Sequence, residues 1–235
     1  MSVAATICLD ALGTLIELLA PAPALVPELR SRGIDVDERQ ARAALREEIA
    51  FYRAHHDSAV DPASLALLRE RCTEVLRDGL ARAGAAGVAA APHELLRDAL
   101  LAALRFRAYP EVPTALRALR GAGHRIVVVS NWDVSLHDAL RTTGLEPLID
   151  AAISSAEAGA AKPDPRIFER ALSLVGCDAG AGAAIHAGDT LEHDVAGARA
   201  AGLRAVLVVR AGRPPAVPVG VAVIRSLAEL EALAA

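Results

Sequence analysis

The chain has 235 residues, a formal net charge of −4 and a hydrophobic content of 53%. That content suffices for a packed interior and excludes a disordered chain. The net negative charge and an aromatic content of only 3% argue against a nucleic-acid partner, and the charge argues against an anionic membrane surface. Cys8, Cys72 and Cys177 are isolated, which favours a reducing compartment. Because Asp10 interrupts the apolar N-terminal stretch and no Lys or Arg precedes it, we predict no signal peptide and a cytoplasmic location.

The N-terminal stretch reads as a buried strand that ends in a carboxylate. An apolar run at residues 6–9 leads to Asp10, and a turn follows with Gly13 and Thr14. Ligands of open α/β sheets bind beyond the carboxyl ends of the strands, so Asp10 stands where chemistry is expected. An aspartate there can act as a nucleophile and form a covalent intermediate. The alternative is that Asp10 only caps the turn.

Residues 20–107 are predicted to be an all-helical insertion. Residues 16–27 are apolar and rich in proline, and we expect a loop or flap there. Asp37 with Gln40 forms a capping-box pattern at the start of a helix. Asp61 followed by Pro62 starts a second helix that runs to Gly84, and a third begins near Pro92.

From Tyr109 onward, helix and strand patterns alternate, as in a parallel sheet. We predict strands at residues 124–129, 149–154, 183–187, 205–209 and 221–224. We predict helices at residues 112–122, 134–143 and 164–175, then one through Ala201 that Gly202 terminates, and one at 227–233. The predicted fold is α/β, a doubly wound parallel Rossmann-like sheet with an inserted all-helical cap domain. The predicted core comprises residues 1–18 and 108–235, and the predicted cap comprises 19–107, which would exclude water and select the substrate.

Polar residues follow four strand ends or adjoining loops. Taken singly, each has an ordinary structural explanation in a turn, a helix cap or a solvated charge. In this order along the chain, however, the set is specific; it consists of Asp10 and Thr14, Ser130 and Asn131, Lys162 before Pro163, and Gly188 and Asp189 followed by Asp194. It resembles the four motifs of the haloacid dehalogenase superfamily, and the likeness covers the whole predicted core. The sequence around these motifs looks closest to the branch that holds the dehalogenases.

The resemblance implies a role for each motif residue. Asp10 would be the nucleophile, and Thr14 would orient it and tie down the turn. Mg²⁺ would be bound by Asp10, the backbone carbonyl of Leu12, Asp189 and, directly or through water, Asp194. Ser130 and the amide of Asn131 would hold phosphoryl oxygens, and Lys162 would neutralise charge on the transferred group. The partner would be a small phosphorylated or halogenated molecule.

Leu12 is the main departure from the phosphatase pattern. Phosphatases of this family normally carry there a second aspartate, which protonates the leaving group and later activates water. General acid–base catalysis contributes about 10² to 10⁴ in rate. Three functions therefore remain open: a Mg²⁺-dependent phosphatase, a metal-independent 2-haloacid dehalogenase, and a catalytically weak binding or regulatory protein. The phosphatase would act on esters with acidic leaving groups or take an acid from the cap, where Tyr52, His55 and His56 are candidates.

Two further residues are singled out. Trp132, next to the Ser130–Asn131 pair, is expected either to line a substrate cleft between core and cap or to pack in the interior. His186, inside a predicted strand, is expected to be a core histidine and not a ligand.

Overall fold

The computed structural model describes residues 5–177 and 184–234, so Ala183, at the start of one predicted strand, lies outside the described residues. The chain divides into two compact units. One comprises the residues up to Glu17 and those from Arg107 onward, and the other is Leu18–Phe106. No helix within the described residues is long and apolar enough to cross a membrane. The cytoplasmic location stays a prediction.

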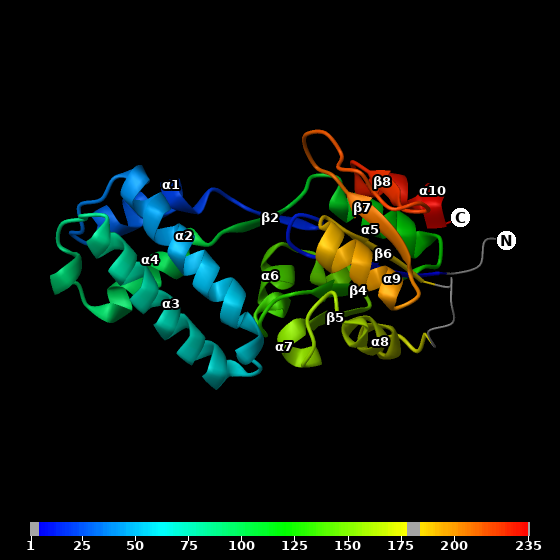
Figure 1. The fold of residues 1–235 in the computed structure, drawn as a ribbon, viewed down its shortest axis with the longest axis horizontal. Helices are drawn as coiled ribbons and strands as arrows, with labels where there is room; N and C mark the ends of the chain where they lie inside the picture. The colour runs from blue at the N-terminus through cyan, green and yellow to red at the C-terminus, as the bar shows by residue number, and fades with distance from the viewer. Residues whose placement is uncertain (1–4, 178–183, 235) are drawn as a thin grey trace. The chain divides into compact units, whose positions relative to one another are not determined.

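A six-stranded sheet forms the centre of the first unit, in the order β5-β4-β1-β6-β7-β8 (Figure 1). The bounds are β1 Thr6–Leu9, β4 Arg125–Ser130, β5 Ala151–Ser154, β6 Ala184–Gly188, β7 Arg204–Val208 and β8 Ala222–Ile224. Every neighbouring pair is parallel. β1 is central, and Leu9 pairs with Val128 on one side and Ala187 on the other. The carboxyl ends of β1, β4 and β6 therefore lie side by side at one edge.

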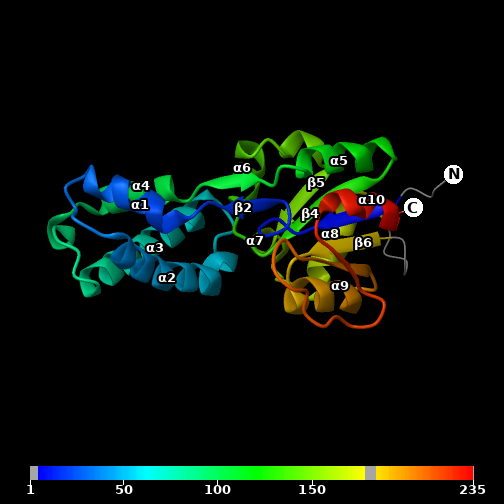
Figure 2. The ribbon, with the colours of Figure 1, turned by 90° about the horizontal axis from the view of Figure 1, so that it is seen from above.

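Helices cover both faces of this sheet. Figure 2 shows α5 and α10 on one side and α9 on the other. The helices of this unit are α5 Val112–Gly121, α6 Leu136–Thr142, α7 Ser155–Ala158, α8 Pro165–Leu174, α9 Ala196–Ala200 and α10 Leu230–Ala234. Shorter turns are η3 Glu146–Leu148, the π-helical turn η4 Leu191–Val195 and η5 Leu227–Glu229. This is the doubly wound α/β fold predicted from the alternating pattern, which is confirmed.

The strands alternate their side chains between the two faces, and one face packs against α8 and α9. Cys8, Val127 and Val129 on the strands pack in one cluster with Ile167 and Phe168 of α8. All five are fully buried, so the cysteine acts as a small apolar residue. The cluster fixes α8 under the strands whose ends carry the candidate site.

The second unit is helical, with α1 Pro21–Arg30, α2 Glu38–His55, α3 Pro62–Arg82 and α4 His93–Ala103, and the 3₁₀ turns η1 His56–Ser58 and η2 Val88–Ala90. Two of the predicted caps are confirmed. The carboxylate of Asp37 accepts from the backbone N–H of Gln40 at 2.7 Å, and that of Asp61 accepts from the backbone N–H of Ser64 at 2.8 Å.

The loop predicted for residues 16–27 is wrong over most of its length. Residues 21–27 lie in α1. One face of this helix is buried through Ala22, Leu25 and Leu29. Pro21 and Pro23 lie in its first turn, where the backbone N–H groups have no partner within the helix, so no hydrogen bond is lost.

We predicted no strand between residues 20 and 107, and this is wrong at the end of that range, where β3 begins. β2 Ile16–Leu18 and β3 Phe106–Ala108 pair with each other where the chain passes from one unit to the other. Phe106, which lies inside the range predicted to be all-helical, is therefore a strand residue. Three-residue strands are too short for alternation of apolar and polar residues to show in a sequence.

Candidate active site

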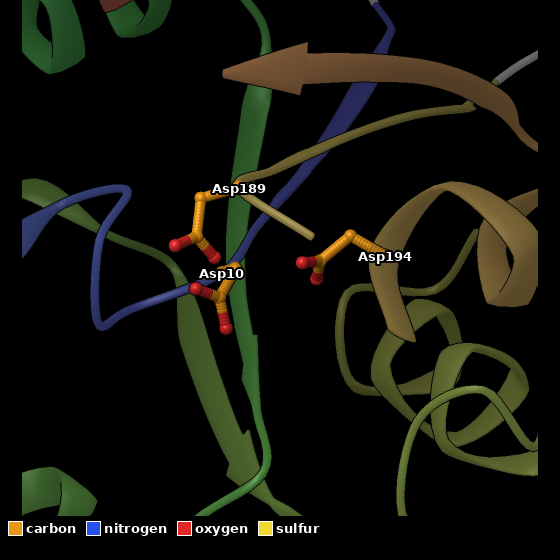
Figure 3. Close-up of side chains that lie close together, drawn as sticks. All are labelled: Asp10, Asp189 and Asp194. Carbon is orange, nitrogen blue, oxygen red and sulfur yellow. The ribbon is translucent and has the colours of Figure 1, made fainter. Parts of the chain in front are cut away.

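Three carboxylates converge at the carboxyl edge of the sheet (Figure 3). Asp10 follows β1, Asp189 follows β6, and Asp194 lies in η4. Each offers a ligand atom, and these atoms all lie within 4.8 Å of one another. Asp10 and Asp194 are buried, whereas Asp189 is exposed. Among the described residues, this is the only cluster of histidine, cysteine and acidic side chains with the spacing of a metal site.

Lys162 joins two of these carboxylates. Its Nζ lies 2.6 Å from Oδ1 of Asp10 and 2.6 Å from Oδ1 of Asp194, and the side chain is almost fully buried. The side chain of Asn131 holds the backbone of Lys162: Nδ2 donates to the Lys162 carbonyl at 2.9 Å and Oδ1 accepts from the Lys162 N–H at 2.7 Å. Charge-assisted hydrogen bonds such as those of Nζ are the strong ones. Lys162 is therefore held both at its backbone and at its ammonium group.

Asp194 accepts four hydrogen bonds. Oδ1 accepts from Lys162 Nζ and, at 2.9 Å, from Nε2 of His186. Oδ2 accepts from the hydroxyl of Thr190 at 2.6 Å and from its backbone N–H at 2.9 Å. Gly188 leaves room for this carboxylate, because a Cβ there would lie 2.1 Å from Cγ of Asp194. Asp194 is thus directed at Lys162 by its surroundings.

The pKa values of the site follow from burial and from charge. Burial raises the pKa of Asp10, although Lys162 acts in the opposite direction. Burial would lower the pKa of Lys162, but Asp10 and Asp194 outweigh it and raise that pKa, so the ammonium stays charged. Burial would also raise the pKa of Asp194, but Lys162 and His186 hold it well below its usual range. For Asp189, desolvation and the like charges of Asp10 and Asp194 raise the pKa to about 7.

The loop after β1 brings two more of the predicted residues to this edge. Leu12, two residues after Asp10, is 37% exposed, so an apolar side chain faces solvent there. Thr14 is fully buried, and its hydroxyl has no hydrogen-bond partner among the described residues. The expected contact between Thr14 and Asp10 is therefore not seen; the turn is held by the backbone, as in the N–H of Gly13 donating to the carbonyl of Ile16 at 2.8 Å.

Ser130 and Trp132 lie at and just beyond the end of β4 but differ in what they contact. The hydroxyl of Ser130 donates to Oδ1 of Asp10 at 3.1 Å, so Ser130 belongs to the cluster. Trp132 is 7% exposed, and its indole N–H donates to the hydroxyl of Ser135 at 3.3 Å. These contacts favour packing for Trp132, and a contact with substrate stays a prediction. Tyr52, His55 and His56 all lie in the helical unit.

Sequence reasoning did not identify His186 and Arg210 as site residues. His186 was expected in the core and is fully buried there, yet it also binds Asp194. The guanidinium of Arg210 donates to the carbonyl of Thr14 and to the carboxylate of Glu111, and it stacks 4.0 Å from the ring of Tyr109. A histidine three residues before Asp189 was a visible signal; Arg210, just beyond β7, gave none.

Comparison with known proteins decides the family. A sequence model described as haloacid dehalogenase-like hydrolase matches residues 4–202. The chain belongs to the haloacid dehalogenase-like hydrolases. The resemblance drawn from the motifs is therefore confirmed, as is the prediction of a hydrolase-family enzyme.

Individual relatives carry both phosphatase and dehalogenase names. The chain is 44% identical to haloacid dehalogenase-like hydrolase domain-containing protein 3 of Bos taurus over 103 residues, 44% of this chain and 39% of that protein. It is 36% identical to the phosphoserine phosphatase of Thermus thermophilus over 147 residues, 62% of this chain and 56% of that enzyme. The matches thus span less than two thirds of either relative. The crystal structure of a 2-haloacid dehalogenase from Pseudomonas syringae is similar with a TM-score of 0.65 and 25% identity, covering 98% of both chains.

Proposed function

We propose that this haloacid dehalogenase-like hydrolase is a Mg²⁺-dependent phosphatase that forms an aspartyl-phosphate on Asp10. The observation that carries the proposal is Asp189, a carboxylate that lies beside two other carboxylates and makes no ion pair among the described residues. The dehalogenases that the motifs resemble have uncharged residues at this position and use no metal. An uncompensated Asp189 would repel both the nucleophile and a haloacid carboxylate.

The residues present fit a hard divalent cation. Three carboxylates share one ammonium, so two negative charges remain uncompensated, and a divalent cation would match them. All donors are oxygens, which Mg²⁺ prefers. Asp10, Asp189 and the carbonyl of Leu12 would hold the ion, with Asp194 acting directly or through water. When bound, Mg²⁺ would neutralise charge on the phosphoryl oxygens.

The chain's own groups supply the remaining steps. An oxygen of Asp10 attacks phosphorus, the bond from phosphorus to the leaving oxygen breaks, and water later hydrolyses the aspartyl-phosphate. The Lys162 ammonium, held between Asp10 and Asp194, opposes the negative charge that develops on the transferred group. The hydroxyl of Ser130 donates to Asp10. Together with the backbone amide of Asn131, it would orient the phosphoryl oxygens.

Leu12 restricts the substrates. An apolar side chain at this position cannot protonate a leaving alkoxide, so we expect substrates whose leaving group departs without a proton, such as acyl or aryl phosphates. We further propose that the helical unit, Leu18–Phe106, is a cap that selects the substrate. The proposed substrate class is therefore a small molecule phosphorylated on an acidic leaving group.

The test compares two reactions with and without metal. Acetyl phosphate and p-nitrophenyl phosphate are expected to be hydrolysed with Mg²⁺, with loss of the reaction in EDTA and in Asp10→Asn. Release of chloride from 2-chloropropionate without metal would overturn the proposal in favour of a dehalogenase. Inactivity in both assays at full Mg²⁺ occupancy, measured by calorimetry, would indicate a binding protein.

A further inference from the structure

We propose that His186 is a positioning residue that holds Lys162 against Asp10 through Asp194. The role of Lys162 at Asp10 rests on the proposed function, but the contacts do not. They form one continuous line: Oδ1 of Asp10 to Nζ of Lys162 at 2.6 Å, Nζ to Oδ1 of Asp194 at 2.6 Å, and that same oxygen to Nε2 of His186 at 2.9 Å. Both Lys162 and His186 converge on one oxygen.

The hydrogen between His186 and Asp194 belongs to the histidine. An ionised carboxylate only accepts, so Nε2 carries the hydrogen and donates it. Because His186 and Lys162 share Oδ1 of Asp194, the donor at Nε2 restricts the direction from which Lys162 can approach that oxygen. Thr190 occupies the other oxygen with two donors, so the carboxylate cannot rotate without breaking three hydrogen bonds. Removing the outer-shell partner of a metal ligand typically lowers metal affinity or activity about 10- to 100-fold, and we expect a loss in the same range for this carboxylate.

Burying His186 carries a cost that an aliphatic side chain at this position would avoid. It lies inside β6 between Ile185 and Ala187, fully buried, where an aliphatic side chain would leave no polar atom unpaired. Its Nδ1 has no hydrogen-bond partner among the described residues, and the ring meets Phe168 edge-on with centroids 4.9 Å apart. An unpaired buried nitrogen costs stability. The edge-on contact with Phe168 would be open to other apolar rings, whereas the hydrogen bond from Nε2 to Asp194 needs a donor at this position.

The environment of Lys162 can be observed directly by NMR, because the sequence contains one lysine. Lys162 is the single lysine of the chain, and the remaining 24 of the 25 Lys and Arg residues are arginines. Protein grown on lysine labelled with ¹³C at Cε therefore gives one side-chain signal, which reports on Lys162 whether or not the enzyme turns over.

The experiment compares four proteins: wild type, His186→Met, His186→Gln and His124→Met. Met removes the donor at similar volume, whereas Gln retains an amide N–H near the position of Nε2. His124 is the matched control, since it is a buried histidine of the same unit whose Nδ1 accepts from the backbone N–H of Ala5 at 3.1 Å, away from the site. Thermal unfolding is recorded for all four.

In His186→Met, we expect the lysine signal to shift or split and kcat for acetyl phosphate to fall about 10- to 100-fold, with a smaller change in KM. His186→Gln should restore the wild-type signal and most of kcat, and His124→Met should lower Tm without moving the signal. If His186→Met does not fold, His186→Asn, whose amide stops one carbon short of that of Gln, replaces it. A folded His186→Met with an unchanged lysine signal, or a His124→Met signal moved as far, would overturn the inference. A shifted signal in a protein without phosphatase activity would support the positioning role and contradict only the proposed function.

Discussion

Gly13 and Asp189, which are far apart in the sequence, meet so closely that no side chain fits between them. A Cβ on Gly13 would lie 2.2 Å from Oδ2 of Asp189, and Gly13 has a φ of +85°, in the left-handed region. Two independent constraints therefore require glycine at this position, one from the backbone and one from the carboxylate of Asp189.

Gly13→Ala separates these two constraints when it is compared with Gly144→Ala. Gly144 has a φ of +73°, and a Cβ added there would meet no neighbouring atom within 4 Å, so its substitution adds backbone strain alone, about 1 to 2 kcal/mol of unfolding free energy. Gly13→Ala adds the displacement of Asp189. We expect both variants to lose stability in urea unfolding, but only Gly13→Ala to lose Mg²⁺ binding in calorimetry. Equal Mg²⁺ affinity in the two variants would contradict this.

Lys162→Met removes the charge shared by Asp10 and Asp194. Breaking a buried ion pair by removing one partner costs about 3 to 5 kcal/mol, because the remaining charges stay buried. Arg166→Met is the control: Arg166 pairs with Asp164, but its side chain is 64% exposed. Exposed pairs add little to stability because water screens them. Urea unfolding at pH 7 gives both values, and similar losses in the two variants would count against a stabilising role of the buried cluster.

We expect the stability of the helical unit to depend on pH because Glu48 is buried there. It is buried in α2, and burial raises its pKa to about 7, against the effect of a hydrogen bond with Cys72. With a folded pKa above the unfolded value of 4.5, the folded state binds the extra proton between those values. The stability connected with protonated Glu48 is therefore complete below pH 4.5 and is lost as the pH rises through about 7.

Glu48→Gln removes this dependence. Its unfolding free energy relative to wild type should increase between pH 4.5 and pH 8 by up to the order of 3 kcal/mol. Glu47→Gln serves as the matched control, because Glu47 is the neighbouring residue of the same helix and its side chain is 46% exposed. Urea unfolding followed by circular dichroism at both pH values measures the difference. A Glu48→Gln effect that is independent of pH would show that the carboxyl is not buried as described.

Leu12→Asp places an acid two residues after Asp10, the proposed nucleophile. If only the acid is missing, turnover of an alkyl phosphate with Mg²⁺ should rise at least about tenfold, towards the 10²- to 10⁴-fold range of general acid–base catalysis. Leu12→Asn, equally polar but without a transferable proton at neutral pH, should give no rise. Steady-state kinetics of both variants test this, and an unchanged rate in Leu12→Asp would mean that another group already supplies the proton.

Local rules were sufficient for much of the fold. The caps at Asp37 and Asp61 were predicted because a carboxylate and an N–H three residues later meet in any helix start. The same holds for the alternating strands and helices from residue 109 onward. The failure at residues 16–27 has a local cause as well: prolines were read as breakers, although Pro21 and Pro23 stand where a helix tolerates them.

The family could be identified from the order in which the polar site residues follow one another along the chain: Asp10, Ser130, Lys162, Asp189 and Asp194. Each follows a predicted strand or loop, and a parallel sheet brings the ends of these segments to one edge. Which atoms meet there was decided only by the tertiary structure. Lys162 contacts Asp10 across 152 positions of sequence, and His186 contacts Asp194 because the chain turns sharply after β6. Sequence patterns report on neighbours a few residues apart, whereas these contacts depend on the register of β1 against β6 and on the packing of α8 beneath them, to which residues throughout the core contribute.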